Sequence, residues 1–162
     1  MHDKTNAMRL LDKAGVSYGT HQYDSGDGIV DGVSVAHKIG VPEERVYKTL
    51  VTQGHSGGHY VFVIPVAAEL DLKLAARAVG EKAIEMIPLA SLTKLTGYVR
   101  GGCSPFGMKK PFPTVLDSTA ELQASIVVSA GRLGQQVELA PAELLRITGG
   151  KTVPVTHAHE KK

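Results

Sequence analysis

Apolar and polar positions change period several times along the chain, which predicts short helices mixed with short strands. Residues 7–14 place alanine and leucine at the i, i+3, i+4 and i+7 spacing of one helical face, and Gly15 supplies a stop. Residues 16–23 alternate weakly, as a strand does. Residues 25–32 are rich in Gly and Asp and predict a loop, and residues 35–39 predict a second short helix.

The middle of the chain predicts a β-hairpin followed by a helix. Residues 46–51 are β-branched, aromatic and apolar, and residues 60–64 are continuously apolar, as in a strand covered on both faces. The Gly, Ser and His residues of 54–58 suit a turn between the two strands. Asp71 is a candidate N-cap for a helix that Gly80 ends.

The second half continues the same mixture. Residues 89–95 predict a helix, and residues 100–113 form a loop dense in glycine and proline. Further elements are predicted as strands at 114–116, 125–128 and 136–139, a helix that begins at 141, and an edge strand at 153–155. Because strands and helices alternate without a regular βαβ rhythm, we expect an α+β fold with a mixed, curved, barrel-like β-sheet and flanking helices. We expect residues 1–156 to form a single domain and residues 157–162 a disordered tail.

Composition narrows the classes of protein and of site. The chain has 162 residues, of which 43% are hydrophobic and 21% are charged, as expected of one globular domain. Its single cysteine, Cys103, excludes an intramolecular disulfide framework and a four-thiolate zinc site. We expect no metal and no cofactor. Aromatic residues make up only 5%, which argues against a broad stacking platform for nucleic-acid bases.

The charge balance bounds the partners. A net charge of +2 is too mild to indicate DNA binding, but it is compatible with contact to a short anionic group such as an RNA end. No apolar run approaches the roughly 20 residues that span a bilayer. The N-terminus has no apolar segment typical of a signal peptide, so we expect a cytoplasmic protein that does not bind membranes.

Lys48 is the first residue whose type does not match its position. In a strand, Val46, Lys48 and Leu50 point to the same face, which leaves an ammonium group between two apolar neighbours. One interpretation is an electrostatic anchor for an anion or a polarised carbonyl inside a pocket. The alternative is an edge-strand lysine that discourages the addition of another strand. The residues alone leave both open.

The second unusual segment is the loop that runs from Gly101 to Gly107 and on through Lys109 and Lys110. Glycines allow a backbone to approach a ligand and to turn its N–H groups toward it. Arg100 and the two lysines add positive charge nearby. The loop lacks the GxxxxGK[ST] pattern of a P-loop. It is either an oxyanion-binding or phosphate-binding loop or a rigid surface connection.

No nucleophile is evident from the sequence. Cys103 lacks a histidine that the sequence places beside it as a base, so burial as a small hydrophobic residue is the favoured interpretation. His55 and His59 are four residues apart, but the Ser-Gly-Gly between them breaks any helix and excludes a helical metal pair. Tyr23 follows a predicted strand and either packs in the core or hydrogen-bonds at the rim of a pocket.

Several segments together resemble one family, the YbaK/EbsC group of free-standing aminoacyl-tRNA deacylases, which are related to the editing insertion domain of bacterial prolyl-tRNA synthetase. The matching segments are Arg45-Val-Tyr-Lys-Thr-Leu-Val51, Leu70-Asp-Leu-Lys73, Thr96-Gly-Tyr98, the G-x-x-x-P loop Gly101–Pro105 and Val128-Ser-Ala-Gly-Arg-Leu-Gly134. Each motif is weak alone, but their order extends the likeness over about residues 7–147.

The resemblance implies a compact mixed-sheet barrel and an activity that removes mischarged cysteine from tRNA(Pro). It implies partners too, namely the acceptor end of an aminoacylated tRNA and prolyl-tRNA synthetase. It implies that Lys48 and Gly101 are catalytic. The substrate-binding residues that it implies are Tyr23, Thr49, Gly102, Cys103, Ser104, Pro105 and Ser129.

The implied mechanism needs no protein nucleophile, because the thiol of the bound cysteine attacks its own ester carbonyl and a thiolactone leaves. Two positions depart from the pattern of the best-known branch: Gln136 replaces an acidic residue, and Asp31 replaces an aromatic one before Gly32. Both affect the amino-acid specificity. An alanyl- or seryl-tRNA deacylase of similar build, or a non-catalytic module that binds a tRNA end or a nucleotide, is the alternative.

Overall fold

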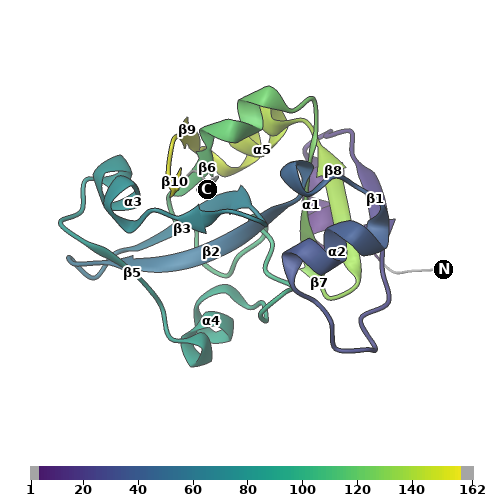
Figure 1. Cartoon of the computed structure of the whole chain (residues 1–162), viewed down its shortest axis with the longest axis horizontal. Coiled ribbons are helices and arrows are strands. Elements are labelled where there is room, and N and C mark those ends of the chain that lie inside the picture. The colour runs from purple at the N-terminus through teal and green to yellow at the C-terminus, as the bar shows by residue number, and fades with distance from the viewer. Residues whose placement is uncertain (1–3, 158–162) are drawn as a thin grey trace, which may run out of the picture.

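The strands form three sheets in a computed structural model that describes residues 4–157 (Figure 1). The orders are β5-β2-β3-β6-β9, β1-β8-β7 and β10-β4. The strands are β1 (Gly19–Gln22), β2 (Tyr47–Gly54), β3 (His59–Pro65), β4 (Glu69–Leu70), β5 (Ile84–Met86), β6 (Thr114–Asp117), β7 (Ile126–Arg132), β8 (Gln135–Leu139), β9 (Lys151–Val153) and β10 (Thr156–His157). The helices are α1 (Asn6–Lys13), α2 (Gly32–Ile39), α3 (Leu72–Val79), α4 (Leu89–Thr96) and α5 (Pro141–Thr148), with 3-10 turns at Glu43–Arg45 and Ser118–Leu122.

The five-stranded sheet is mixed. The predicted hairpin of β2 and β3 is confirmed, with a register that runs from Tyr47 opposite Pro65 to Gln53 opposite His59. β5 pairs antiparallel with the far end of β2, whereas β3–β6 and β6–β9 are parallel pairs. β2 therefore lies inside the sheet and is not an edge strand.

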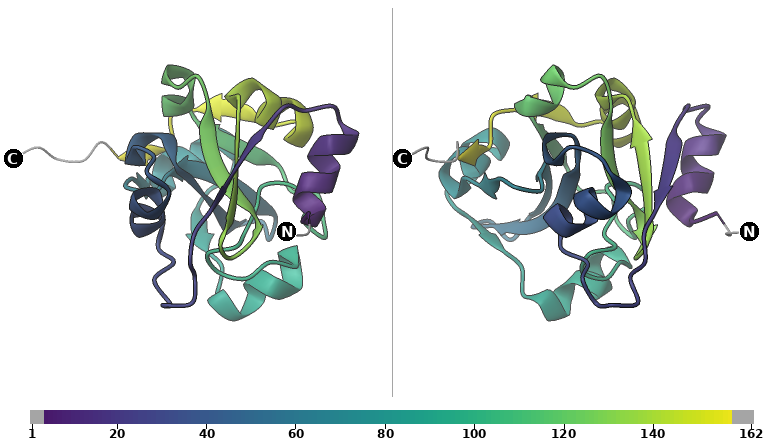
Figure 2. Two further views of the ribbon diagram at one scale, coloured as in Figure 1. Left: turned by 90° about the vertical axis from the view of Figure 1, so that its right-hand side faces the viewer. Right: turned by 45° about the vertical axis from the view of Figure 1, so that its right-hand side comes forward.

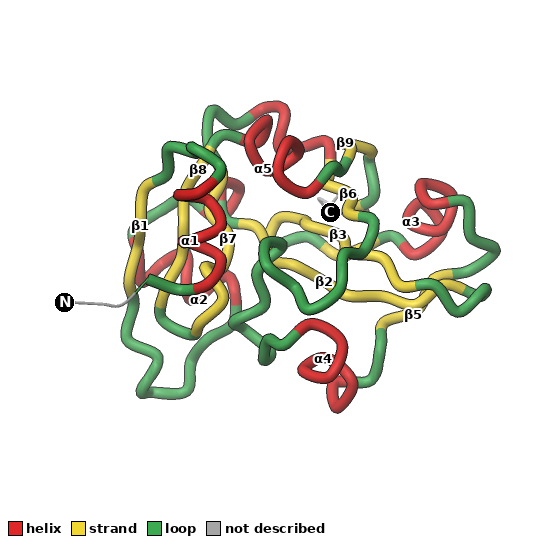
Figure 3. The backbone as a smooth tube through the Cα atoms, turned by 180° about the vertical axis from the view of Figure 1, so that it is seen from behind, coloured by secondary structure: helices red, strands yellow, loops and turns green. Residues whose placement is uncertain are grey.

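The two larger sheets meet where Val46 forms a parallel bridge with Val127. In Figure 3 the sheet of β1, β8 and β7 stands at one end of the molecule, and β2, β3 and β5 extend away from it. The predicted mixed α+β architecture with flanking helices is confirmed, but the sheets do not close into a barrel. The Val46–Val127 bridge connects the two larger sheets at the start of β2, and the other end of β2 pairs with β5.

The main core lies between the two sheets, where strand alternation sends one side of each strand inward. α1, α5 and the glycine-rich loop close it. Its buried members are Ala7, Met8, Leu11, Val16, Tyr47, Val51, Val61, Val63, Tyr98, Cys103, Phe106, Leu116, Ala120, Ile126, Val128, Ala130, Val137, Leu139 and Leu144. A second cluster places α3 on the opposite face of β3 and β6. A third places α2 over the Val46–Val127 bridge, so α1 and α2 lie on opposite sides of the β1-β8-β7 sheet (Figure 2).

Helix boundaries follow the predicted capping residues. Asp71 accepts hydrogen bonds from the N–H groups of Lys73 and Leu74, both at 3.0 Å. Gly80 ends the same helix in the left-handed conformation, which glycine adopts without a Cβ penalty. No helix among residues 4–157 has the length and the apolar character needed to cross a membrane.

The C-terminal elements differ from the prediction. The strand expected at 153–155 begins earlier, as β9, and stops at Pro154, which has no N–H to donate to a ladder. His157, which we assigned to the tail, forms β10 opposite Glu69, and its Nδ1 lies 3.2 Å from a carboxylate oxygen of Asp71. The other predicted tail residues, 158–162, lie outside the described residues.

Candidate functional site

Lys48 is half-buried on β2, directly opposite Ile64. Burial lowers the pKa of Lys48 below its ordinary value, and the nearby charge of Glu69 partly opposes this. β3 pairs with β2 at Lys48, whereas on the other side of β2 the bridge at Val46 and the β5 pairing at Thr52–Gly54 lie to either side of the lysine. The ammonium group is partly withdrawn from water, as expected of a charge that faces a pocket.

The bridge between the two sheets brings Lys48 and Ser129 to one face. Val46 and Val127 pair in parallel and share one apolar cluster. Because strand side chains alternate, the residues two positions further along each strand project to the same side as the bridged pair. Those residues are Lys48 and Ser129, from segments 81 positions apart in sequence.

The β1-β8-β7 sheet extends this face with a row of polar residues. Ser129 lies opposite Gln136 on β8, and Gln136 lies opposite His21 on β1. The Ser129 hydroxyl accepts a hydrogen bond from the N–H of Gly131 at 3.1 Å. Gln136 is buried, although its side chain is polar. Lys48, Ser129, Gln136 and His21 are hereafter called the polar row.

Tyr23 stands where β1 ends. Its N–H donates to the carbonyl oxygen of Gly134 at 3.0 Å, and the ammonium of Lys38 lies 5.6 Å from the centre of its ring. The tyrosine contributes to an open cavity of about 450 Å³. The residues that line this cavity are Gln22, Tyr23, Asp24, Ser25, Leu133, Gly134 and Gln135.

Three buried side-chain atoms of the described residues have no hydrogen-bond partner: the hydroxyl oxygens of Tyr23 and Thr49 and the side-chain oxygen of Gln136. Thr49 projects from the face of β2 opposite to Lys48, beside the main core. Leaving a buried polar group unpaired costs about 1–3 kcal/mol. The three atoms come from the residue after β1, from β2 and from β8, and no group of the described residues hydrogen-bonds to them. Hydrogen bonds to a polar ligand would satisfy them.

The glycine-rich loop approaches the same hairpin turn that Tyr23 binds. Gly101 has a φ of +83°, and a Cβ on it would lie 3.0 Å from Cδ2 of Leu133 and 3.3 Å from Cγ2 of Val30. A Cβ on Gly102 would lie 3.3 Å from the backbone nitrogen of Leu133. Tyr23 and the loop therefore contact one turn, at residues 131–134, and the close approach together with the positive φ of Gly101 favours glycine.

Within the loop, the side chains of Cys103, Ser104 and Pro105 are buried. Burial raises the pKa of Cys103 to about 12, so its thiol is protonated at neutral pH. The Ser104 hydroxyl accepts a hydrogen bond from the N–H of Phe106 at 3.2 Å. The three residues shape the loop from inside it.

The backbone amides of the loop are divided between structural and free groups. The N–H of Gly102 donates to the carbonyl oxygen of Val99 at 2.9 Å, so it is not available to a ligand. Within residues 4–157, no hydrogen bond uses the N–H of Gly101 or of Cys103. An oxyanion at this loop would find its donors there.

A polar cluster that the sequence analysis missed lies next to the polar row. The carboxylate of Glu138 contacts Nε2 of His21 at 2.7 Å, accepts a hydrogen bond from the Ser125 hydroxyl, and lies 3.9 Å from Arg45. Burial favours a raised pKa for Glu138, but the hydrogen bonds and the charges of His21 and Arg45 outweigh it and lower that pKa. The sequence contains one indication of this cluster: Glu138 and Gln136 are two positions apart on β8 and therefore share a face. His21 is 117 positions away.

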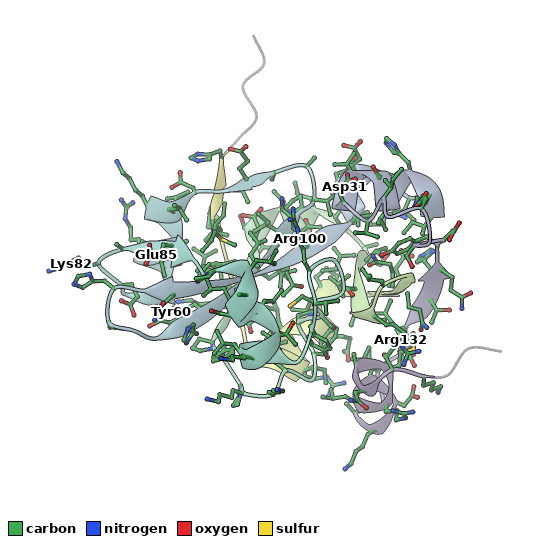
Figure 4. All side chains as sticks on the ribbon, turned by 90° about the horizontal axis from the view of Figure 1, so that it is seen from below. Asp31, Tyr60, Lys82, Glu85, Arg100 and Arg132 are labelled. Carbon is green, nitrogen blue, oxygen red and sulfur yellow. The ribbon has the colours of Figure 1, made fainter. Side chains whose placement is uncertain are left out.

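Asp31 and Gly32, the second departure from the family pattern, have structural reasons. Asp31 caps α2 by accepting from the N–H of Ser34 at 3.1 Å, at the start of the helix (Figure 4). A Cβ on Gly32 would lie 2.4 Å from Cγ1 of Val66. Over residues 4–157, no three His, Cys, Asp or Glu side chains are grouped as a metal site requires.

Comparison with known proteins gives consistent matches. The sequence profile of the aminoacyl-tRNA editing domain matches residues 29–147. A protein of Enterococcus faecalis, EbsC, provisionally assigned as a Cys-tRNA(Pro)/Cys-tRNA(Cys) deacylase, is 46% identical over 94% of this chain and 93% of its own length. Among solved structures, one provisionally described as a trans-editing enzyme for prolyl tRNA synthetase matches with a TM-score of 0.79 at 23% identity, over 96% of this chain and 100% of its own. The hypothetical protein APE2540 matches with a TM-score of 0.82 at 22% identity, over 92% of this chain and 97% of its own.

Proposed function

The chain belongs to the aminoacyl-tRNA editing domain family, and from that premise we propose that it acts in trans to remove mischarged cysteine from tRNA(Pro). The observation that carries the proposal is the trio of unpartnered buried oxygens on Tyr23, Thr49 and Gln136, of which Gln136 belongs to the same polar row as Lys48. An esterified amino acid offers an ammonium group and ribose hydroxyls as donors for such oxygens. It also offers a carbonyl for positive groups to polarise.

The proposed roles follow from the chemistry of each group. The ammonium of Lys48 holds the aminoacyl end and stabilises the negative charge that develops on the ester carbonyl oxygen. The free N–H groups of Gly101 and Cys103 are the candidate donors for that oxyanion. Tyr23, Thr49 and Ser129 orient the amino acid and the terminal ribose, and Gln136 accepts a hydrogen bond from the ammonium of the substrate.

In the proposed step the nucleophile belongs to the substrate. The sulfur of the esterified cysteine attacks its own carbonyl carbon, a C–S bond forms, and the C–O bond to the tRNA ribose breaks. The proton of the thiol passes to the ribose oxygen, and the products are a cyclic thiolactone and free tRNA. Holding the attacking atoms in place is worth roughly 7–11 kcal/mol in favourable cases. The thiol of Cys103 takes no part as a nucleophile, because at neutral pH it is protonated.

The proposal is tested by amino-acid release from tRNA(Pro) charged with cysteine, serine, alanine or proline. We expect release of cysteine, and retention of serine, which has a hydroxyl in place of the thiol. Faster release of alanine or serine would assign the chain to a different substrate. No release from any of the four would favour a module that binds tRNA without editing it.

We further propose that the protein works in the cytoplasm with prolyl-tRNA synthetase. A purely steric pocket separates side chains of similar size poorly, so cysteine is a predictable error of that enzyme. With a net charge of +2, this chain alone would bind tRNA weakly. Adding the synthetase to the release assay is expected to lower the KM for Cys-tRNA(Pro) without changing kcat.

A further inference from the structure

Charge is segregated along this chain. Residues 86–116 contain Lys94, Arg100, Lys109 and Lys110 but no Asp or Glu. All 16 acidic residues lie outside this segment, together with the other 14 of the 18 lysines and arginines. The mild net charge of the whole protein therefore conceals a purely cationic stretch, which includes α4 and the glycine-rich loop.

The four cations of the segment face solvent without acidic partners. All four residues are exposed, and none forms an ion pair within residues 4–157. By contrast, Lys4, Lys38 and Arg146 each contact a carboxylate. An exposed cation with no partner keeps its full charge for an external anion.

The fold brings the loop that carries Lys109 against the end of α4, which carries Lys94. The N–H of Lys109 donates to the carbonyl oxygen of Thr96 at 3.0 Å, and the Cγ of Lys109 lies 3.3 Å from the Cβ position of Gly97, at the end of α4. Lys94 lies in the last turn of the same helix. Arg100 directly precedes Gly101 and lies four residues beyond the end of α4.

A cavity of about 290 Å³ continues the surface on the other side of Lys94. It lies between α4 and the β2–β3 hairpin. Its lining combines the possible hydrogen-bond donors Gln53, His59, Ser91 and Lys94 with the apolar Ile87, Pro88 and Leu95. Such a mixture suits a phosphate with its attached sugar and base better than it suits an apolar ligand.

We propose that Lys94, Arg100, Lys109 and Lys110 form a phosphate-binding surface that holds the sugar–phosphate backbone of the tRNA acceptor end next to the glycine-rich loop. This rests on the proposed function for the identity of the RNA. It adds the surface on which the RNA lies and the residues that hold it. The terminal ribose would lie at Gly101, and the preceding phosphates would follow the surface along α4 toward the cavity.

The test measures binding of an uncharged RNA hairpin that carries the acceptor stem and the single-stranded 3′ end, by fluorescence anisotropy over a range of salt concentrations. The variant replaces the four cations by glutamine (K94Q, R100Q, K109Q, K110Q). The matched control replaces four exposed cations elsewhere (K13Q, K73Q, R77Q, K82Q) and thus removes the same charge. Figure 4 shows Lys82 beside Glu85 at one end of the sheet, away from Arg100.

For single strands, each phosphate that the protein neutralises adds about 0.7 to the slope of log affinity against log salt. We expect the four-site variant to bind at least tenfold more weakly at low salt and to show a flatter slope, by about 0.7 for each phosphate that it no longer neutralises. The control should keep the slope of the wild type. Equal losses of affinity in both variants, or an unchanged slope in the first, would overturn the proposal.

Because the hairpin carries no amino acid, this readout is independent of the deacylation reaction. If wild-type protein binds the hairpin through the surface but releases no amino acid from any charged tRNA, the editing function fails and the surface stands. If release occurs but the four-site variant binds as the control does, the surface fails and the editing function stands. Thermal unfolding of both variants checks that each is folded.

Discussion

A Cβ atom on Gly101 would lie 3.0 Å from Cδ2 of Leu133, so the glycine-rich loop and the β7–β8 turn approach so closely that a methyl group there would force a neighbour to shift. The φ of Gly101, +83°, adds a backbone conformation that other residues adopt only with strain. We predict that Gly101→Ala displaces the loop, lowers the rate of deacylation by at least tenfold and costs about 1 kcal/mol of stability.

Gly57→Ala is the matched control for Gly101→Ala. Gly57 has a φ of +96° but nothing within 4 Å of its Cβ position, and it lies in the β2–β3 turn. It shares the backbone strain without the steric conflict. We therefore expect a similar loss of stability in a denaturant titration and an unchanged rate of deacylation. Equal loss of activity in both variants would show that the close approach to Leu133 has no role in the reaction.

Thr49→Val separates a functional hydroxyl from a structural one. Because the Thr49 hydroxyl is buried without a partner, its removal relieves an unpaired polar group, and we predict a gain of about 1 kcal/mol in the free energy of unfolding. The same change should reduce kcat/KM for Cys-tRNA(Pro) several-fold, because valine cannot form the proposed hydrogen bond to the substrate.

Thr52→Val on the same strand is the comparison for Thr49→Val. The Thr52 hydroxyl is also buried, but it donates to the carbonyl oxygen of Tyr60 at 2.9 Å. Its loss should therefore destabilise the protein by about 1 kcal/mol and leave the rate unchanged. If both valine variants lose stability, the Thr49 hydroxyl is satisfied within the protein and is not available to a substrate.

Lys48→Ala is predicted to reduce deacylation by roughly 10²–10³-fold, the loss typical for removal of a group that stabilises a developing oxyanion. The thermal stability should change little, since the half-buried charge gives up a desolvation cost when it is removed. Lys73→Ala, at an exposed position of α3, is the control and should retain the wild-type rate.

The lowered pKa of Lys48 gives a pH test of the same role. The charged form is the active one, so the rate should fall as pH rises through a pKa below the ordinary lysine value of 10.5. Lys48→Arg keeps its charge throughout this range and should lose the alkaline fall, whatever its absolute rate. Spontaneous ester hydrolysis, measured without protein, is subtracted at each pH. An alkaline fall that persists in Lys48→Arg would assign the titration to another group.

The sequence predicted local features better than it predicted the site. The β2–β3 hairpin and the Asp71 cap depend on neighbouring residues, so turn chemistry and periodicity were sufficient. The parallel pairing of Val46 with Val127, which brings Lys48 and Ser129 to one face, depends on segments far apart in sequence. Periodicity within either strand contains no information about that pairing.

The sequence also did not predict which polar side chains are buried. Tyr23 was equally compatible with a core residue and with a pocket rim, and Thr49 shares no face with Lys48. Only the packed structure shows that both hydroxyls lack partners. The charge segregation of residues 86–116 is visible in the sequence, but the hydrogen bond of Lys109 to the end of α4 is not.

Cys103 is predicted to be chemically inert in the folded protein. Burial raises the pKa of its thiol to about 12, so iodoacetamide at pH 8 should modify it only as fast as the protein unfolds. Cys103→Ala should keep the wild-type rate of deacylation and lose about 1 kcal/mol of stability from the smaller core side chain. Rapid alkylation of the native protein together with loss of activity would instead identify Cys103 as a reactive residue.

Glu138 links the polar row to stability at acid pH. Its pKa in the folded protein lies below the unfolded value of 4.5, because the hydrogen bonds from Ser125 and His21 outweigh its burial. A carboxylate with a lowered folded pKa contributes stability above its unfolded pKa, and that contribution is lost as pH falls through the folded pKa. Wild type should therefore exceed Glu138→Gln in unfolding free energy by about 1 kcal/mol at pH 7, and the difference should shrink below pH 4.5.

In Glu143→Gln, the control, only the solvent-exposed pair with Arg146 is removed, so stability at pH 7 should change by a few tenths of a kcal/mol. A difference between wild type and Glu138→Gln that stayed constant from pH 7 to pH 3 would mean that the Glu138 carboxylate is not held by its charge.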